Sequence, residues 1–372
     1  MKKFLDCISI VGATPSKFHG TKKYVSTGAV ATTEIDESEV VEVTYEDRPS
    51  RANLSADAGD ILFAKMQGTR KTLLLDSETE KNIYSTGFYA VRANPEVITT
   101  ECLYYLIDSE LFLAQKDKNC SGATQKAITN GGMAKIEISV PALSEQGILV
   151  DKLKHLTQLI ADKKKQLNLF DEITKSRFIE MFGDPVTNPL RWAMLPLEKC
   201  LTVLGGYAFK SEEFKTSGVP VLKIGNINTG AFTPTNMVYW SKDDCLTRYQ
   251  VLPGDLVISL TGTVGKDDYG NVCILGDAYP MYYLNQRNAK LILDGELNKH
   301  YLSELLKFSQ IKKKLTGISR GVRQANISNR DILNLVVPIP PIEIQVQFAA
   351  FVEQVDKSKY HGEFTCGMEV AA

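Results

Sequence analysis

Apolar residues follow two spacings along this chain, and the spacing predicts which segments are strands and which are helices. Short runs rich in β-branched and aliphatic residues favour strands, and these runs are Asp60 to Ala64, Phe88 to Arg92, Ile136 to Val140, Pro220 to Ile224, Asp255 to Ser259, Ala289 to Leu293 and Leu333 to Pro338. Apolar positions three or four residues apart favour helices at Thr100 to Lys116 and Asn298 to Leu315. The pattern predicts a mixed α/β (α+β) fold, built on a twisted sheet with a few helices.

A much longer helical signal occupies the middle of the chain. Its apolar positions form the seam of a coiled coil with a few polar interruptions. The seam is Leu149, Leu153, Leu156, Ile160, Leu167, Phe170 and Met181, and the interruptions are Lys163, Thr174 and Arg177. Ser144 can cap the start, and Gly183 and Pro185 can close the end. The 39 residues from Ser144 to Phe182 predict a helix of about 58 Å, which needs a partner helix to bury its seam.

A second helical segment begins after Pro341 and is the natural partner of the first. Its apolar positions are Phe348, Phe351, Val352 and Val355. The helical pattern ends near Lys359, and residues 360–372 lack heptad spacing. We therefore expect a partner helix less than half as long as the central one.

The chain also repeats itself at a period of 199 residues. Without a gap, Gly122, Gln125, Ile128, Asn130, Pro141 and Gln146 recur as Gly321, Gln324, Ile327, Asn329, Pro340 and Gln345. Six identities in such a window exceed the roughly one or two expected by chance, so one folded domain is present twice. The predicted parts are a domain at 1–142, a central helix at 143–184, a second domain at 185–340, a distal helix at 341–360 and a tail at 361–372.

Composition narrows the class of protein only slightly. At 372 residues and 44% hydrophobic content, the chain can form two separate cores. It contains no run of about 20 apolar residues and no export signal, so we expect a cytoplasmic protein without membrane contact. The seven cysteines are scattered, without the close spacing of a zinc site or a disulfide framework.

Positive charge gathers at the same place in both copies, although the net charge is only −1. Between Lys307 and Arg330 there are seven basic residues and no acidic one, and between Leu111 and Lys135 there are four basic residues and one acidic one. A solvated basic face is the ordinary explanation of such a segment. Its recurrence beside the repeated Gly-x-x-Gln equally favours neutralisation of nucleic-acid phosphates.

Three stretches of the second copy resemble the specificity subunit of type I restriction-modification systems. The opening is Gly206 to Ser211 and Gly218 to Ile227, the middle is Leu252 to Ser259, and the close is Gln324 to Gln345. In the first copy, Gly12 to Val30 matches the opening only loosely. The resemblance covers nearly the whole chain, in the order variable domain, long helix, variable domain, shorter helix.

The resemblance implies a non-catalytic subunit whose two target-recognition domains each bind one half of a bipartite, asymmetric site in double-stranded DNA. Two long helices form an antiparallel coiled-coil spacer that also docks two methyltransferase (modification) subunits. Restriction subunits join the larger complex. The partners carry out adenine methylation and cleavage, so S-adenosylmethionine is expected on the methyltransferase and no cofactor on this chain. The expected helix contacts are Leu149, Leu153, Leu156, Ile160, Leu167, Phe170, Phe348, Phe351 and Val355.

Two loops in each domain carry the side chains that could contact DNA. Base edges are bound by hydrogen-bonding side chains on loops or helix ends. In the first domain these are Lys65, Gln67, Thr69, Arg70 and Lys71, followed by Thr124, Gln125 and Lys126. In the second domain they are Thr261, Thr263 and Lys266, followed by Arg320, Arg323 and Gln324. Because most protein hydrogen bonds to DNA go to its backbone, each of these residues taken singly is favoured as a phosphate contact or an ordinary surface residue over a base contact. The repeated Gln125 and Gln324 could instead hold their loops in shape.

Enzymatic alternatives fit the sequence less well. An adenine methyltransferase needs an Asp/Asn-Pro-Pro-aromatic loop, which is absent from the sequence. The stretch from Gly262 to Lys266 lacks the glycine spacing of a phosphate loop, and Asp267 stands where Ser or Thr is required. Glu213 and Lys215 have the Glu-x-Lys spacing of many nucleases but no preceding Pro-Asp at a suitable distance.

A protein-binding adaptor is the alternative from another class. In that case the helix hairpin would bind partners and the globular domains would bind protein rather than DNA. Coiled-coil seams alone do not distinguish the two functions. Salt-dependent DNA binding that weakens on removal of Arg320 and Arg323 would do so.

Overall fold

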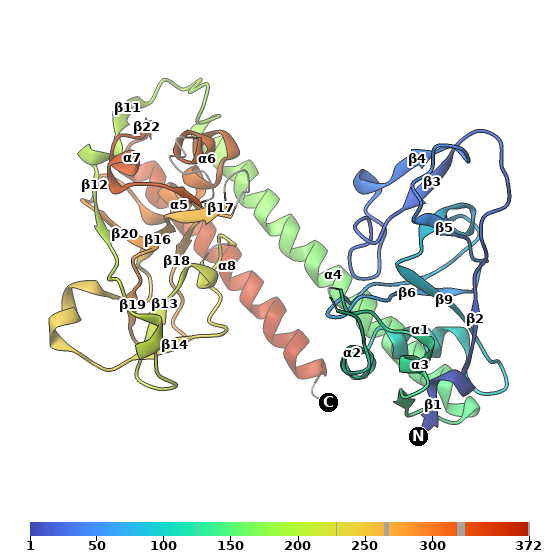
Figure 1. The fold of residues 1–372 in the computed structure, drawn as a ribbon. Coiled ribbons are helices and arrows are strands. Elements are labelled where there is room, and N and C mark those ends of the chain that lie inside the picture. Colours follow the sequence, from blue (N-terminus) through green and yellow to red (C-terminus); the bar gives the residue numbers. More distant parts are fainter. Residues whose placement is uncertain (124, 228, 264–267, 318–323, 371–372) are drawn as a thin grey trace. The chain divides into compact units, whose positions relative to one another are not determined.

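The computed structural model describes residues 1–123, 125–227, 229–263, 268–317 and 324–370, with the backbone alone for residues 324 and 360–370. The chain divides into two compact units, Met1–Asp162 and Lys163–Ala372, called unit 1 and unit 2 below. Each unit contains its own sheets, helices and buried core, which confirms the predicted mixed α/β class (Figure 1).

Unit 1 is built on two four-stranded sheets and one short strand pair. The strands of the first sheet are β2 (Ile8–Val11), β6 (Ile61–Ala64), β7 (Thr72–Leu74) and β9 (Phe88–Ala93). Those of the second sheet are β3 (Lys22–Val25), β4 (Val41–Val43), β5 (Ala52–Leu54) and β8 (Ile83–Ser85). The short pair is β1 (Lys2–Lys3) with β10 (Glu137–Ile138). The orders are β2-β9-β6-β7, antiparallel throughout, and β4-β3-β8-β5, in which β3 and β8 are parallel.

Three short helices lie at the end of unit 1 away from β3 and β4 (Figure 1). They are α1 (Thr100–Ile107), α2 (Glu110–Lys118) and α3 (Asn130–Met133). Phe112 of α2 packs edge-on against Phe63 of β6, with ring centroids 5.6 Å apart. Both rings also contact Phe4, at 4.9 and 6.3 Å. Strand β6 is buried along its whole length because helices cover one of its faces and the second sheet's core lies on the other.

Unit 2 repeats this architecture. The strands of its first sheet are β12 (Leu201–Gly205), β16 (Leu256–Ser259), β18 (Val272–Ile274) and β20 (Asn288–Leu293). Those of its second sheet are β13 (Val219–Leu222), β14 (Val238–Trp240), β15 (Gln250–Val251) and β19 (Tyr282–Leu284). Two further pairs join β11 (Ala193–Pro196) to β22 (Val336–Ile339) and β17 (Thr261–Thr263) to β21 (Gln324–Asn326).

The strand orders of unit 2 are those of unit 1 position by position. They are β12-β20-β16-β18 and β14-β13-β19-β15, again with one parallel pair at the centre of the second sheet, β13 and β19. Individual backbone bonds recur as well: Gly59 N–H donates to Leu75 O at 2.8 Å, and Gly254 N–H donates to Leu275 O at 2.8 Å. The structure therefore shows the duplication that the repeat in the sequence predicts.

The opening motif, clear in the second copy, also has a structural counterpart in the first. Gly12 directly follows β2, as Gly206 directly follows β12. A side chain at Gly12, whose φ is +96°, would lie 2.6 Å from a methyl carbon of Leu54. A side chain at Gly206 would lie 2.2 Å from the carbonyl oxygen of Asn285. Both positions require glycine because two backbones, or a backbone and a core side chain, approach closely.

The described part of unit 2 contains four α-helices of its own and the end of a fifth, α4, which begins in unit 1. They are α4 (Leu143–Phe182), α5 (Lys299–Lys307), α6 (Ser309–Thr316), α7 (Asn329–Leu333) and α8 (Ile342–Val370). The C-terminal end of α4 enters the core of unit 2, where Phe178 and Phe182 are almost completely buried. Phe178 stacks on Tyr301 of α5 at 5.3 Å and meets Phe348 of α8 at 5.5 Å.

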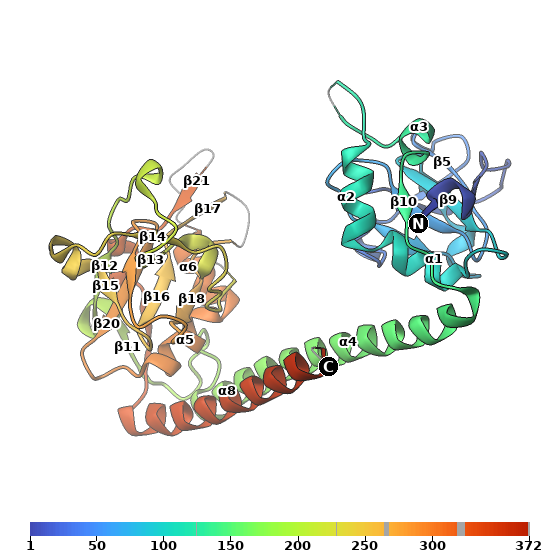
Figure 2. The ribbon, with the colours of Figure 1, turned by 90° about the horizontal axis from the view of Figure 1, so that it is seen from below.

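Within unit 2, α8 runs antiparallel to the C-terminal half of α4 (Figure 2). Contacts pair later residues of α8 with progressively earlier residues of α4. They are Phe348 with Phe182 at 5.4 Å, Phe351 with the Arg177 guanidinium at 5.8 Å, and Lys359 Nζ with Asp171 Oδ1 at 2.7 Å. The expected antiparallel helix pair is therefore present.

The repeated Gln146 anchors the start of α4 to unit 1. Its side chain is fully buried, and its Oε1 accepts from the N–H of Thr99 at 2.7 Å. Its Nε2 donates to the carbonyls of Val97 and Pro141, both at 3.0 Å. Because Thr99 caps α1, one amide group joins the beginning of α4 to the beginning of α1.

Gln345 makes the equivalent bonds in unit 2. Its Oε1 accepts from Asn298 N–H at 2.8 Å, and its Nε2 donates to Glu296 O at 3.1 Å and Pro340 O at 2.7 Å. Asn298 caps α5, so the start of α8 is joined to the start of α5. The identity of these two glutamines thus has a structural cause in both copies.

Several predicted boundaries are wrong. The single helices expected at Thr100 to Lys116 and Asn298 to Leu315 are each two helices. Ser109 interrupts the first, because its backbone is extended and its hydroxyl caps α2, and Phe308 interrupts the second with φ −61° and ψ 123°. Leu333, expected in a strand, ends α7.

The predicted cap of the central helix and the predicted end of the distal helix also need correction. The central helix begins at Leu143, so Ser144 lies inside its first turn and does not cap it. The distal helix does not end near Lys359: α8 continues to Val370, giving 29 residues against the 40 of α4. Heptad spacing predicts only where a helix can pack, and a helix continues without it when no Pro or helix-terminating Gly intervenes.

No helix in the described part of the chain has both the length and the apolar character needed to cross a membrane.

Candidate nucleic-acid interface

The two loops predicted to contact DNA lie side by side in unit 1. The first follows β6 at residues 65–71, and the second spans residues 121–127. Met66 and Ala127 form an antiparallel bridge. Gln67 N–H donates to Lys126 O, and Ile128 N–H donates to Lys65 O, both at 2.9 Å. The loops thus form one surface from segments about 60 residues apart in the sequence.

The corresponding loops of unit 2 are joined in the same way. Here the pairing is extensive enough to form the strands β17 and β21, seen side by side in Figure 2. Ile327 N–H donates to Leu260 O at 2.8 Å, which is the equivalent of the Ile128 to Lys65 bond. The Thr261 hydroxyl donates to Asn326 Oδ1 at 2.9 Å. Each unit therefore presents two hydrogen-bonded loops, called the paired loops below, and in unit 2 they form a two-stranded ribbon.

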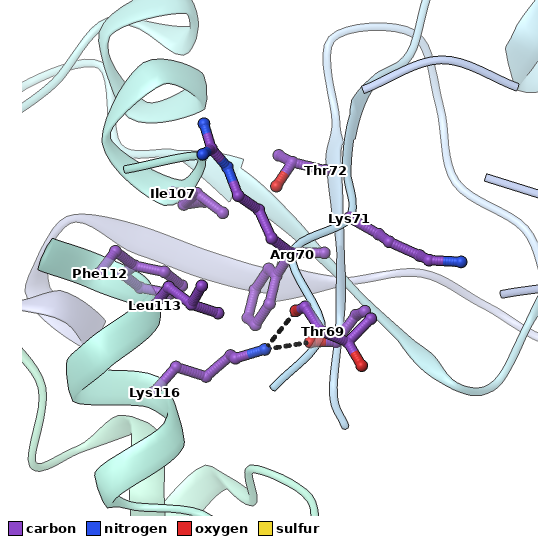
Figure 3. A pocket seen from close by; sticks show the side chains of 10 residues that line it. Thr69, Arg70, Lys71, Thr72, Ile107, Phe112, Leu113 and Lys116 are labelled. Carbon is purple, nitrogen blue, oxygen red and sulfur yellow. Dashed lines mark hydrogen bonds between the residues drawn. The ribbon is translucent and has the colours of Figure 1, made fainter. Parts of the chain in front are cut away.

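A buried lysine fixes the first paired loop of unit 1. Lys116 of α2 is only 2% exposed, and its Nζ donates to the carbonyls of Thr69 at 2.7 Å and Ala64 at 3.3 Å (Figure 3). It also donates to the carbonyl of Met66 at 3.0 Å. Burial lowers the pKa of Lys116, while the neighbouring Asp117 carboxylate raises it. Sequence analysis missed this residue, although a lysine on the apolar side of a helix, four positions after Phe112, is the available signal.

Asp117 adds two further bonds to the same loop. Its Oδ2 accepts from Gly68 N–H at 3.0 Å, and its backbone carbonyl accepts from Gln67 Nε2 at 3.2 Å. Gln67 is exposed, whereas Thr69, whose carbonyl binds Lys116, is half-buried. The C-terminal turn of α2 therefore holds the loop along most of its length.

Two predicted DNA-contacting cations of unit 1 are engaged within the protein. Arg70, which points away from Lys116 in Figure 3, donates to both oxygens of Asp108 at 2.8 and 3.0 Å and to Glu110 at 3.0 Å. The hydrogen bond to Asp108 is the main cause of the raised pKa of Arg70. Lys71 donates to the carbonyl of Thr27. Either side chain must give up these bonds before it can contact DNA.

The other predicted residues of unit 1 differ in their exposure. Lys65 is half-buried with its Nζ 4.3 Å from the centre of the Tyr89 ring, and burial lowers its pKa. Gln125 and Lys126 are exposed in the second paired loop. Thr124 lies outside the described residues. Both exposed side chains are accessible to a ligand.

In unit 2, Thr261 is 8% exposed and holds the ribbon together from inside. Thr263 is exposed, with its N–H and hydroxyl donating to the two oxygens of Asp268 at 2.8 and 2.9 Å. The predicted residues Lys266, Arg320 and Arg323 and the side chain of Gln324 lie outside the described structure.

The predicted coiled-coil residues fall into two groups. Phe348 and Val355 are buried in unit 2, and Phe351 is half-buried beneath Arg177. The others keep an exposed or half-exposed side chain: they are Leu149, Leu153, Leu156, Ile160, Leu167 and Phe170. The seam prediction missed Phe178 and Phe182 and counted Thr174 as a polar interruption. Thr174 is buried, and its hydroxyl is satisfied by donating to the carbonyl of Phe170 at 2.9 Å.

Comparison with known proteins identifies the same family in both units. The model of the type I restriction modification DNA specificity domain matches residues 10–169 and again residues 189–361. The type I restriction enzyme MjaVIII specificity subunit of Methanocaldococcus jannaschii is 26% identical over 301 residues, which are 74% of this chain and 68% of that subunit. The EcoKI specificity subunit of Escherichia coli is 26% identical over 188 residues, 46% of this chain and only 38% of that subunit.

A solved structure has the same fold. The S subunit of a type I restriction-modification system from M. genitalium superposes with a TM-score of 0.55 at 12% identity, covering 100% of this chain and 92% of its own. The family match extends over both units and recurs at the positions that the internal repeat predicts. The chain therefore belongs to the family of type I restriction modification DNA specificity domains.

Proposed function

We propose that this chain is the DNA-recognition subunit of a type I restriction-modification complex, in which each unit binds one half of a bipartite, asymmetric DNA site. The observation that carries the proposal is the paired loops. Both units build them with equivalent backbone bonds, Ile128 to Lys65 and Ile327 to Leu260, yet place different side chains on them. A constant scaffold with different exposed side chains is suited to binding two different half-sites.

The proposal assigns the chemistry to partner subunits. Two methyltransferase subunits, with S-adenosylmethionine bound to them, would methylate adenine, and restriction subunits would cleave unmodified DNA. The antiparallel helices α4 and α8 would provide the spacer and the docking surface. The family match over both units favours this function over a protein-binding adaptor, because the matching family consists of DNA specificity domains.

The geometry of the nuclease-like residues supports a non-catalytic role. Glu213 forms its ion pair with Lys210, at 3.3 Å, and not with Lys215. Lys215 Nζ instead donates to the hydroxyl of Ser241 at 2.5 Å. Both side chains of the Glu-x-Lys spacing are therefore bound to other residues of this chain. We expect the isolated chain to leave DNA intact with Mg²⁺, and cleavage that is lost in Glu213→Gln would contradict this.

Mapping methylated adenines in cells that carry this chain and its methyltransferase subunit tests the proposal. We expect a motif in two specific parts separated by unspecified bases. A single uninterrupted motif, or methylation that does not depend on this chain, would falsify the proposal.

DNA binding by the purified complex provides a second test. Phosphate contacts make binding weaker as salt increases. Arg320→Ala and Arg323→Ala should weaken it further, since they remove two charges from the more basic copy. Binding that is unaffected by salt and by both substitutions would support the adaptor alternative.

A further inference from the structure

A third loop lies next to the paired loops of unit 2. It joins β19 to β20 and consists of Asn285, Gln286 and Arg287. The carbonyl of Arg287 accepts from Leu260 N–H at 2.8 Å, one residue before β17 begins. Leu260 in turn accepts from Ile327, next to β21. One residue therefore connects the third loop to both strands of the ribbon.

The backbone of this loop is held tightly. Tyr207 N–H donates to Leu284 O at 2.8 Å, and Gln286 N–H donates back to Tyr207 O at 2.9 Å. A further hydrogen bond spans the loop, because Asn288 N–H donates to Asn285 O at 2.9 Å. These bonds depend on Gly206, which leaves no space for a side chain beside Asn285, as described above. The opening motif of the second copy thus has a function: it clamps the third loop.

The side chains of Gln286 and Arg287 project from this rigid backbone into solvent. Both residues are exposed. Neither side chain forms a hydrogen bond or an ion pair with any residue that the structure describes. Arg70 of unit 1 is different, since Asp108 and Glu110 already bind it. An amide and a guanidinium, unpaired and mounted on a fixed loop, can bind a ligand without first losing internal bonds.

The corresponding loop of unit 1 has the same backbone but different chemistry. Gly87 O accepts from Lys65 N–H at 2.9 Å, which is the equivalent of the Arg287 to Leu260 bond. Only Thr86 and Gly87 lie between β8 and β9, and Ser85 at the end of β8 is buried. The loop therefore offers no side chain with two donors in a fork. The two units therefore differ in the chemistry of their third loops.

We propose that Gln286 and Arg287 are specificity-determining residues that contact purine base edges in the major groove of the half-site bound by unit 2. The proposal rests on the function proposed above. Arg binds the O6 and N7 of guanine through two hydrogen bonds, and Gln binds the N6 and N7 of adenine in the same way. The third loop then reads adjacent base pairs, while the paired loops beside it supply further contacts.

The test uses the complete methyltransferase complex and begins from the two-part motif of the unsubstituted protein. Duplexes with single base changes in each half-site are compared in competition binding, and methylated motifs are mapped in cells. For Arg287→Ala we expect a loss of about 5- to 150-fold in discrimination at one guanine position of one half-site. Gln286→Ala should relax a neighbouring adenine position. Discrimination in the other half-site should not change.

Two matched variants make the result specific. Arg287→Lys keeps the charge but loses the two-donor fork, so it should retain general DNA affinity and lose the base preference. Lys199→Ala removes one exposed positive charge just before β12, at the end of the β12–β20 pair opposite the third loop. Lys199→Ala should leave base discrimination unchanged in both half-sites. Thermal unfolding of every variant checks that unit 2 remains folded.

The opposing results are equally distinct. Arg287→Ala could instead weaken binding to all sequences alike and reduce the slope of log affinity against log salt concentration by about one. In that case Arg287 contacts a phosphate and the inference is wrong. Unchanged discrimination with Arg287→Ala also overturns it. If the proposed function itself is wrong, the unsubstituted complex will yield no two-part motif. This outcome distinguishes failure of the function from failure of the inference.

Discussion

Lysine is rarely buried unless its ammonium group has hydrogen-bond partners, and Lys116 illustrates the reason. Its three N–H donors are directed at the carbonyl of Ala64, at the end of β6, and at those of Met66 and Thr69 in the loop that follows. These bonds occupy the ammonium group within the protein. Its contribution is to give the first paired loop of unit 1 a defined shape.

Lys116→Met should therefore loosen the loop while preserving the aliphatic packing. Unpaired buried carbonyls cost about 1 to 3 kcal/mol in the free energy of unfolding. Amide hydrogen exchange of residues 65–71 should accelerate, and discrimination should fall only in the half-site bound by unit 1. Lys118→Met, on the exposed side of the same helix, is the control. Unaltered exchange in the Lys116 variant would contradict the assigned role.

The buried amide of Gln345 should be equally important for unit 2. Gln345→Ala leaves the N–H of Asn298 and the carbonyls of Glu296 and Pro340 without their partner. We expect the free energy of unfolding of unit 2 to fall by roughly 2 to 4 kcal/mol. Denaturant titration measures it, with Gln354→Ala on the exposed side of α8 as the control. Equal stability of the two variants would show that these hydrogen bonds contribute little.

At the scale of elements, α5 and α8 meet around a titratable group. His300 of α5 is nearly buried, with its Nε2 3.5 Å from Glu353 Oε1 of α8. Burial lowers the pKa of His300 from its usual 6.5, and Lys299 lowers it further. Glu353, Asp356 and Glu304 act in the opposite direction but do not cancel the effect of burial.

This shift predicts how the stability of unit 2 depends on pH. As the pH falls through about 6.5, the unfolded chain binds a proton at His300 before the folded chain does, so the free energy of unfolding decreases. Raising the pH over the same interval should restore the free energy of unfolding. Thermal melts between about pH 5 and 7.5 should show this dependence reduced in His300→Gln and retained in His155→Gln, whose histidine is exposed on α4. The same pH profile in both variants would exclude His300 as the cause.

At the scale of the whole molecule, repeated residues predicted the duplication because some of them have the same structural role in both copies. Gln146 and Gln345 anchor α4 and α8 through equivalent hydrogen bonds, and Ile128 and Ile327 make equivalent backbone bonds to the first paired loop. The pairing of the two loops in each unit could not be predicted, since it joins segments about 60 residues apart that carry no distinctive pattern.

The third loop of unit 2 was missed for a related reason. Asn285 to Arg287 looks like an ordinary polar turn in the sequence. Only the close approach of Tyr207 and Leu260 shows that the turn is rigid and lies beside the paired loops. The central helix was predicted both in place and in extent, whereas the distal helix was predicted too short, because apolar spacing indicates where a helix packs and not how long it is.

The duplication also has a thermodynamic consequence. The buried clusters around Phe63 and Leu62 draw on residues 4–150, and those around Phe178 and Tyr283 draw on residues 178–352. A domain with its own core unfolds as its own cooperative unit. Calorimetry of the isolated chain should therefore resolve two transitions.

The substitution Phe63→Ala should show which of the two calorimetric transitions belongs to unit 1. Phe63 is 2% exposed between Phe4 and Phe112, so its removal should cost about 3 to 5 kcal/mol in unit 1. One transition should move to lower temperature, and the other should stay within the shift produced by Leu111→Ala, whose side chain is 81% exposed in the same unit. If both transitions moved together with Phe63→Ala, the two units would form a single cooperative structure, and a substitution in one unit would then alter binding at both half-sites.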